Sequence, residues 1–174
     1  MPWRHWFYCK VSFGVLKIYY DNNNWNGWNL KGKNLKAYVS VTQLDILNGS
    51  SGADVSVDGT INTDNLNMDF SSGADFTGSI NAASLKVHES SGADMNINGS
   101  AKALIVDASS GADFNGFGLN SETCNAEVSS GASIDITVSK DLVASASSGG
   151  GIRYKGQAII SKFSKSSGGS IKKI

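Results

Sequence analysis

The chain has 174 residues, which is enough for one domain with a sizeable core, and its 15 Lys and Arg residues balance its 15 Asp and Glu residues. Nucleic-acid binding relies on a basic surplus to neutralise phosphates, so this neutral chain predicts no nucleic-acid partner. Gly, Ser, Asn and Asp are abundant and no long apolar stripe of helical period occurs, so we expect an all-β protein with many turns.

Residues 1–43 do not follow the pattern of the rest of the chain. Two stretches within them, GVLKIYYD and LKAYVSV, alternate like strands and enclose the loop NNNWNGWNLKGKN. The start, MPWRHWFYCK, lacks the aliphatic core and the small-residue cleavage site of a signal peptide, and no apolar run is long enough to span a membrane. We expect residues 1–43 to form a non-repeating β cap on the fold that follows, with residues 1–11 atypical or truncated.

The four tryptophans all lie in this segment, at Trp3, Trp6, Trp25 and Trp28. The last two belong to the Asn-rich loop. Aromatic faces beside amide groups can hold sugar rings by stacking and hydrogen bonding. Trp25, Trp28, Asn24 and Asn26 are therefore candidate ligand-binding residues. The alternative is that the loop folds over the open end of the fold as a lid.

From residue 44 onward the chain repeats the motif SSG. Its glycines are Gly52, Gly73, Gly92, Gly111, Gly131, Gly149 and Gly168, at intervals of 21, 19, 19, 20, 18 and 19 residues. Two apolar or small residues two positions apart precede the copies, at Leu44/Ile46, Leu66/Met68, Leu85/Val87, Leu104/Val106, Cys124/Ala126 and Leu142/Ala144. A second apolar series follows each corner, at Val55, Phe76, Met95, Phe114, Ile134, Ile152 and Ile171. Both series have the spacing of side chains on one face of a strand. A later glycine, at Gly59, Gly99, Gly118 and Gly156, marks a further bend.

This repeat pattern predicts a solenoid. Two strands and two bends within about 19 residues leave no room for a crossover helix, so successive coils should stack in parallel at about 4.8 Å. The leucine-rich repeat pattern and the six-residue rhythm of left-handed β-helices are both absent. We predict a single-stranded right-handed parallel β-helix of about seven coils over residues 44–174, forming one continuous domain with the cap. Two lysines in the closing SIKKI should deter edge pairing at its last strand.

Four copies of the motif continue as SSGAD and stack the carboxylates of Asp54, Asp75, Asp94 and Asp113. Neighbours about 5 Å apart should repel by roughly 1 kcal/mol or more at a surface. We favour an Asx-type turn, in which each carboxylate accepts backbone N–H groups. A Ca²⁺ ladder between coils is the functional alternative, and solvated charge is the third. No other cofactor is expected.

The two cysteines, Cys9 and Cys124, lie 115 residues apart and are expected to be buried free thiols. Cys124 falls where other repeats have leucine, so it should pack as a small apolar residue. His88 and His5 are expected to be surface residues. No catalytic residues are predicted.

The chain resembles a known family in the segments GVLKIYYD and YVSVTQLDIL, in the repeated SSGAD and in the closing SSGGSIKKI. They are similar to the head GIN domain family of putative auto-transporter adhesins, over roughly residues 12–174. The resemblance implies a β-helix-like fold and an extracytoplasmic location in the periplasm, outer membrane or cell surface of a bacterium. Family members normally carry a signal peptide and further strands before the GVLKIYYD segment, from which this chain departs. The family supplies no catalytic or binding residue.

Three functions are open from the sequence. The first is a non-enzymatic adhesive module that presents a long regular face to a polysaccharide or protein ligand, since solenoids create extended binding surfaces. The second is a periplasmic scaffold or sensing domain. The third, a polysaccharide lyase or hydrolase, would need paired carboxylates with distinct roles. A catalytic site should break the regularity of the repeat at one place, whereas the carboxylates here recur as copies. The oligomeric state is not predicted.

Overall fold

The computed structural model describes residues 7–20 and 36–174, and the chain divides into two compact units, residues 1–41 and 42–174. In the first unit, β1 (Phe7–Ser12) and β2 (Val15–Tyr20) form an antiparallel two-stranded sheet. The turn residues Phe13 and Gly14 both have positive φ, at 49° and 75°, as in a tight type I′ hairpin. The strand expected at GVLKIYYD is confirmed as β2. The strand expected at LKAYVSV is not found over residues 36–41, which pair with no described strand.

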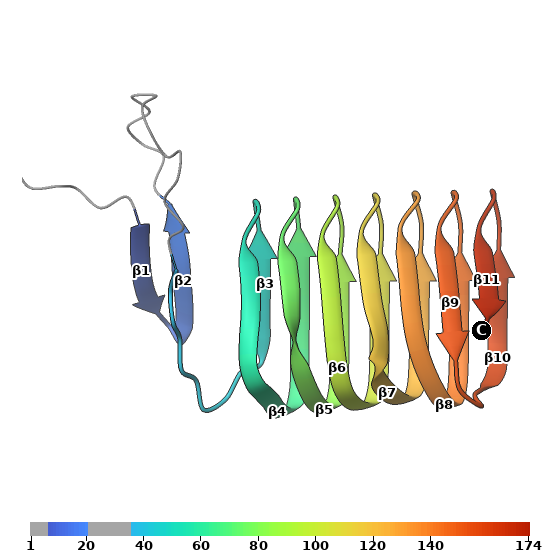
Figure 1. Cartoon of the computed structure of the whole chain (residues 1–174), viewed down its shortest axis with the longest axis horizontal. Coiled ribbons are helices and arrows are strands. Elements are labelled where there is room, and N and C mark those ends of the chain that lie inside the picture. Colours follow the sequence, from blue (N-terminus) through green and yellow to red (C-terminus); the bar gives the residue numbers. More distant parts are fainter. Residues whose placement is uncertain (1–6, 21–35) are drawn as a thin grey trace, which may run out of the picture. The chain divides into compact units, whose positions relative to one another are not determined.

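The second unit is a parallel β-solenoid of about seven coils (Figure 1). Its strands are β3 (Ile46–Ser50), β4 (Asp54–Ser71), β5 (Asp75–Glu89), β6 (Asp94–Ala108), β7 (Asp113–Val128), β8 (Ser133–Ala146), β9 (Gly151–Lys155), β10 (Ile159–Lys165) and β11 (Ser170–Lys173). They form one nine-stranded sheet in the order β11-β9-β8-β7-β6-β5-β4-β3, with β10 on β8. Every pairing in it is parallel. The predicted all-β stack of coils is therefore confirmed.

Each complete coil is one long strand with a broad bend in its middle. We call the part that follows an SSG corner the first limb and the part that leads to the next corner the second limb. In β5 these are residues 75–80 and 85–89. The SSG corners line one end of the coils and the broad bends line the other (Figure 1). Over residues 7–20 and 36–174, no helix is long and apolar enough to cross a membrane.

The SSG corners are tight turns closed by backbone atoms. In the third copy the N–H of Ala93 donates to the carbonyl of Ser90 at 3.2 Å, and both central residues have positive φ, 55° at Ser91 and 70° at Gly92. Two consecutive left-handed residues define a type I′ turn. The N–H of Gly92 then donates to Ser110 of the next coil at 3.2 Å. The left-handed glycine was expected, whereas the left-handed second serine was not, since serine rarely adopts this conformation.

Apolar side chains fill the space between the two limbs. Residues alternate inward and outward along both limbs, so each inward residue stacks on its equivalent in the next coil. Phe70 and Phe76 meet edge to face, with ring centroids 5.7 Å apart. Most predicted inward residues are buried, including Cys124, whose thiol has its pKa raised to about 12 by burial.

Two predictions about single side chains are wrong. In the first coil the inward residue is Leu47, which pairs with Met68, while Ile46 faces outward and is 62% exposed. Leu47 lies as far before Gly52 as Met68 does before Gly73, so the expected Leu44/Ile46 pair was one residue out of register, and a one-residue shift exchanges the two faces of a strand. Cys9 is exposed on β1 rather than buried.

The expected second bend is confirmed at Gly99, where φ is 115° and an added Cβ would lie 2.2 Å from the carbonyl oxygen of Ile80. Only glycine can adopt this conformation so close to the neighbouring backbone. Gly59 and Gly156 also have positive φ, but Gly118 does not. The bend is therefore built differently in the coil of β7.

Candidate functional site

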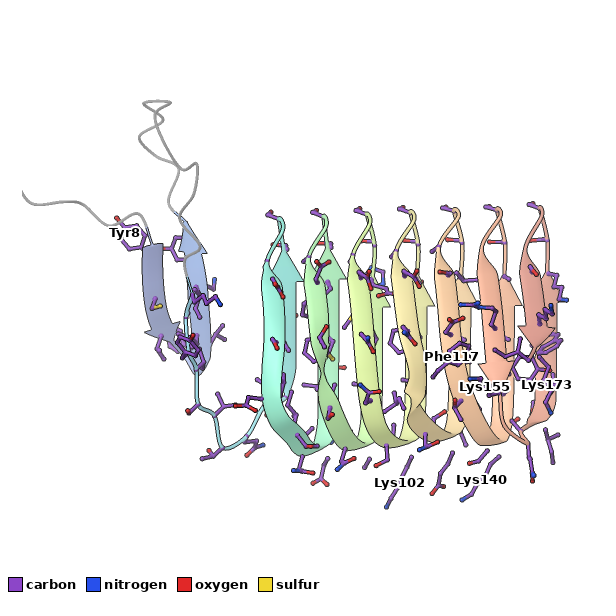
Figure 2. All side chains as sticks on the ribbon, viewed as in Figure 1. Tyr8, Lys102, Phe117, Lys140, Lys155 and Lys173 are labelled. Atoms are coloured by element: carbon purple, nitrogen blue, oxygen red, sulfur yellow. The ribbon has the colours of Figure 1, made fainter. Side chains whose placement is uncertain are left out.

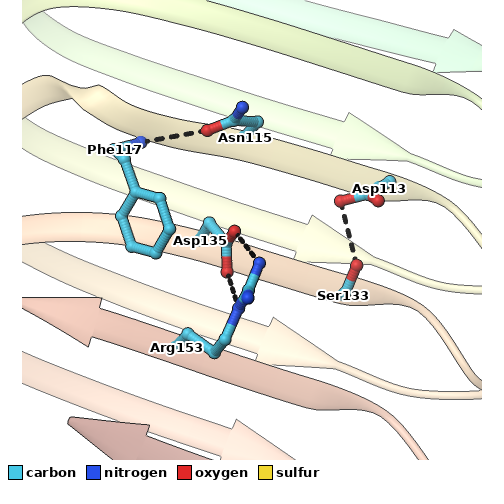
Figure 3. A network of polar contacts seen from close by, with 6 residues as sticks. All are labelled: Asp113, Asn115, Phe117, Ser133, Asp135 and Arg153. Carbon is cyan, nitrogen blue, oxygen red and sulfur yellow. Dashed lines mark hydrogen bonds and ion pairs between the residues drawn. The ribbon is translucent and has the colours of Figure 1, made fainter. Parts of the chain in front are cut away.

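The aspartate column lies on the outward face of the first limbs. The strands pair Asp54 with Asp75, Asp75 with Asp94, and Asp94 with Asp113, and all four residues are exposed. The column ends at Ser133, whose hydroxyl donates to Asp113 at 2.9 Å (Figure 3). The corners of the repeat thus place four like charges in one row.

The expected Asx-type bonds are not formed. None of the four carboxylates accepts a backbone N–H within the described part of the chain, because the type I′ turns are closed by backbone carbonyls. In residues 7–20 and 36–174, no three His, Cys, Asp or Glu side chains are grouped closely enough to hold a metal ion. Calcium binding by Asp54, Asp75, Asp94 and Asp113 stays a prediction.

Burial and like charge both act on Asp94, in the middle of the column. The pKa of Asp94 is raised by desolvation and by the neighbouring carboxylates of Asp113 and Asp75.

Glu89 is a buried carboxyl group that the sequence analysis missed. Its side chain faces the core at the end of a second limb, it is fully buried, and neither carboxyl oxygen has a hydrogen-bond partner among the described residues. Burial raises its pKa to about 9, with smaller contributions from Asp113 and Asp94, so it is a neutral acid at pH 7. Its neighbours in the same column are Phe70 and Ala108. The residue before each SSG faces inward in every complete coil. The repeat pattern therefore contained the information that Glu89 would be buried.

The regular face is broken at one place, next to the end of the aspartate column (Figure 3). Asp135 is buried on the outward side of β8, where Arg153 of β9 binds it through two hydrogen bonds, one of 2.7 Å from Nε to Oδ1. The ring of Phe117 lies beside both cations of this region, with Lys155 Nζ 4.3 Å and Arg153 Cζ 5.6 Å from its centroid. The carboxylate of Asp135 raises the pKa of Arg153. We call Phe117, Asp135, Arg153 and Lys155 the Phe117 cluster; it combines an aromatic ring, two cations and a buried carboxylate.

An irregular stretch of β7 produces this cluster. The register between β7 and β8 shifts between Gly116 and Asn120, and Phe117 lies in the bulge. A bulge re-aims a side chain that regular alternation would place elsewhere. The 20-residue interval between Gly111 and Gly131 was the sequence signal of an extra residue, but its position could not be read from spacing alone.

A ladder of amides and hydroxyls runs along the broad bends. Asn81 donates to Asn62 at 3.1 Å and accepts from the hydroxyl of Ser100 at 2.9 Å. Two shallow depressions flank this ladder and share Asn81. One of about 360 Å³ is lined by Asn81, Ala82, Ser100, Ala101, Lys102, Asn120, Ser121, Glu122 and Ser139, and one of about 750 Å³ by Thr42, Gln43, Asp45, Asn62, Thr63, Asp64, Asn65 and Asn81. Lys102 and Lys140 project at the bends (Figure 2).

Of the remaining candidate residues, the structure describes His88. Trp25, Trp28, Asn24 and Asn26 lie outside the described residues, as do Trp3, Trp6 and His5. His88 is partly exposed on the second limb, with Nδ1 3.4 Å from Asp107 Oδ2. It stands apart from the aspartate column and the Phe117 cluster, which both lie on first limbs.

A family model described as "putative auto-transporter adhesin, head GIN domain" matches residues 8–158. No curated protein matches the chain in sequence.

Three solved structures share the fold, at sequence identities that show the fold alone. A putative adhesin from Bacteroides fragilis superposes with a TM-score of 0.89 at 19% identity, covering 97% of this chain and 77% of the other. A putative lipid binding protein from Parabacteroides distasonis gives 0.70 at 18% identity, covering 97% and 79%. A putative adhesin from Parabacteroides merdae gives 0.62 at 14% identity, covering 97% and 78%.

Proposed function

Because the chain belongs to the head GIN domain family of putative auto-transporter adhesins, we propose that it is a non-enzymatic module of the bacterial cell envelope or surface that binds glycan or protein ligands. The observation that carries this proposal is the outward face of the first limbs. It repeats carboxylate, amide and hydroxyl groups at the spacing of the coils, on a framework held by continuous backbone pairing. Such groups hydrogen-bond to the hydroxyls of sugars and to peptide groups.

The regularity of this face favours binding over catalysis. A binding surface for an extended ligand can use equivalent groups many times, as solenoid proteins do. Acid–base catalysis on glycans needs two carboxyl groups with different proton affinities about the scissile bond. The four outward aspartates occupy equivalent exposed positions of the repeat, and Glu89, whose pKa is strongly raised, is enclosed in the core.

Two sites for the ligand are proposed. The first is the Phe117 cluster, where an aromatic ring lies beside exposed cations and Asn115. The second is the loop that carries Trp25 and Trp28, as the sequence predicts.

The test is to incubate the purified full chain with immobilised host and bacterial glycans and surface proteins, measuring retention and the release of reducing ends in the same wells. We expect retention without release. A Phe117→Ala/Asn115→Ala variant and a Trp25→Ala/Trp28→Ala variant separate the two sites. Asn125→Ala, an exposed change on the second limb of β7, is the matched control.

Release of reducing ends would overturn the non-enzymatic assignment. Loss of retention in one variant only, with the control unchanged, assigns the ligand to that site. Absence of retention on every surface, from a sample whose circular dichroism shows folded β-structure, would contradict a binding function.

A further inference from the structure

The outward face of the first limbs changes the sign of its charge along the solenoid. It carries the aspartate column over β4 to β7, and beyond Ser133 it carries Arg153, Lys155 and Lys172. Residues 142–174 contain no Asp or Glu. We call Arg153, Lys155 and Lys172 the basic patch.

The backbone holds the three cations of the basic patch close together. Arg153 and Lys155 are two residues apart on β9, so they leave the same face of the strand with Cα atoms roughly 7 Å apart. Lys172 of β11 pairs with Arg153, about 4.8 Å away on the neighbouring strand. All three residues are exposed, and the side chain of Arg153 is 58% exposed.

The charge of the basic patch is only partly neutralised. Asp135 accepts hydrogen bonds from Nε and Nη2 of Arg153 and so compensates one cation. Among the described residues, Lys155 and Lys172 have no ion pair. Lys155 Nζ lies instead 4.3 Å from the ring centroid of Phe117, and an aromatic ring attracts a cation without cancelling its charge. Two positive charges therefore remain for an external anion.

This arrangement departs from the repeat. The column that contains Arg153 holds serine, threonine and asparagine in the coils from β4 to β7, and it becomes charged from β8 onward. Deterrence of edge pairing, expected for the lysines of β11, does not account for Lys155, because β9 is paired with β8 on one side and β11 on the other. The bulge in β7 adds the ring of Phe117 beside the same cations.

The surroundings of the basic patch also offer groups for hydroxyls. Asn115 is exposed and lies in the column of Arg153, with the buried Asp135 between them (Figure 3). Its Oδ1 accepts from the N–H of Phe117 at 3.4 Å, and no residue in the described part of the chain accepts from its Nδ2. An amide nitrogen is a donor for a sugar hydroxyl. A ligand with both an acidic group and hydroxyls therefore has partners at the patch and at its border.

Charge argues against a nucleic acid at this place. A long phosphate chain needs a continuous basic surface, whereas the basic patch borders on Asp113 and the rest of the aspartate column, which would repel it. An acidic glycan places its charges on sugar rings rich in hydroxyls, which suits a small basic area beside neutral polar groups.

We propose that the basic patch binds an acidic glycan, through carboxylate or sulfate groups that contact Lys155, Lys172 and the exposed side of Arg153. This inference rests on the proposed binding function and names the ligand class of that site. Asp135 and Phe117 are positioning residues: Asp135 fixes the guanidinium of Arg153 by one edge, and the ring of Phe117 lies beside Lys155.

The test is to measure the affinity of the full chain for dextran, carboxymethyl-dextran and dextran sulfate by biolayer interferometry. The three polymers share one uncharged backbone, so a difference between them reports the acidic group. We expect at least one charged form to bind about tenfold or more tightly than dextran at low salt, and added salt to reduce the difference. The two charged forms separate recognition of carboxylate from recognition of sulfate.

Variants locate the binding. Lys155→Ala/Lys172→Ala should weaken binding of the acidic dextran about tenfold or more, and Phe117→Leu about threefold, since Lys155 then loses the aromatic ring. Lys86→Ala/Lys162→Ala removes the same charge from exposed positions on second limbs and should leave the affinity unchanged. Circular dichroism of each variant checks that the fold is retained.

Equal affinity for charged and uncharged dextran would overturn the acidic ligand class and leave a binding function in place. Binding of acidic dextran that Lys155→Ala/Lys172→Ala does not weaken would show that the basic patch is not the site. A thymidine oligonucleotide of similar charge that binds as tightly would show a general site for polyanions. Absence of binding to all three dextrans would also overturn the inference, and retention on the other glycans and proteins then tests the proposed function separately.

Discussion

The carboxyl group of Glu89 lies in the core between Phe70 and Ala108, at the last inward position before an SSG corner. In the unfolded chain this group has the ordinary glutamate pKa of 4.5, whereas in the folded protein its pKa is about 9. The folded state therefore retains a proton that the unfolded state releases at neutral pH, and this difference lowers stability at pH 7 by about 3 kcal/mol.

Replacing Glu89 by Gln should raise the free energy of unfolding at pH 7 by up to about 3 kcal/mol, because Gln keeps the size of the side chain and has no charge to lose. The stabilisation should vanish below pH 4.5, where Glu89 is protonated in both states, and grow as the pH rises toward about 9. Urea unfolding of both proteins under acidic, neutral and mildly basic conditions measures the difference. A gain that does not change with pH would contradict a neutral buried acid.

At the scale of the structural element, the aspartate column shows how a repeated corner can impose an unfavourable arrangement of charge. The corner sequence is repeated because every coil needs the same type I′ turn, and Asp follows it in four coils. The carboxylates then face outward in one row, where solvent reduces but does not remove their repulsion. The pKa of Asp94 is raised first by desolvation and then by this repulsion from Asp113 and Asp75.

Asp94→Asn should therefore raise the melting temperature slightly at pH 7 and low salt, because the folded state no longer holds a carboxylate between Asp75 and Asp113. The raised pKa in the folded state means that the stabilisation should disappear when the pH falls below 3.8, the ordinary pKa of an aspartate, and salt should diminish it. Differential scanning calorimetry with and without about 5 mM CaCl₂ checks this, a concentration that is ample for weak extracellular-type calcium sites.

A calcium ladder predicts the opposite change in melting temperature for the same variant. If the column binds Ca²⁺, the ion should raise the melting temperature of the native chain, and Asp94→Asn should lose that increase. A native chain that is unaffected by Ca²⁺, together with a stabilised variant, would exclude the calcium ladder. Asp69→Asn, an exposed change on the second limb of β4, is the matched control for the loss of one exposed carboxylate.

At the scale of the whole molecule, the contribution of a residue to stability should depend on the position of its coil along the solenoid axis. Each coil contacts its neighbours, so a central coil is covered on both sides and a terminal coil on one. Leu104 in β6 is 2% exposed, whereas Phe163 in β10 is 40% exposed.

Leu104→Ala should lower the free energy of unfolding by about 3 kcal/mol, from lost burial and the cavity left behind, while Phe163→Ala should cost about 1 kcal/mol. Denaturant unfolding of both variants measures the two losses. Ile105→Ala, at the exposed position next to Leu104, should have a small effect and serves as the control. Equal losses of unfolding free energy in the Leu104 and Phe163 variants would contradict the expectation that a central coil is more stabilised by its neighbours than a terminal one.

The sequence by itself determined the solenoid, its number of coils and most of its inward residues. The reason is that a stacked coil must repeat its glycine corners and apolar positions at one period, and SSG made that period visible. Two details were missed. Counted back from the SSG glycine, the spacing puts Leu47 and not Ile46 inward, so that error was one of counting, whereas the 20-residue interval signals an extra residue without showing that Phe117 lies in the bulge.

The tertiary structure alone decided what individual polar groups experience. Asp135 is buried under Arg153, and Glu89 is enclosed without a partner among the described residues. The SSG turn is closed by backbone atoms. All three features depend on the directions of groups and on contacts between coils. Periodicity assigns a residue to a face of the strand. It does not state whether a neighbouring coil covers that face, and burial of a charge depends on this cover.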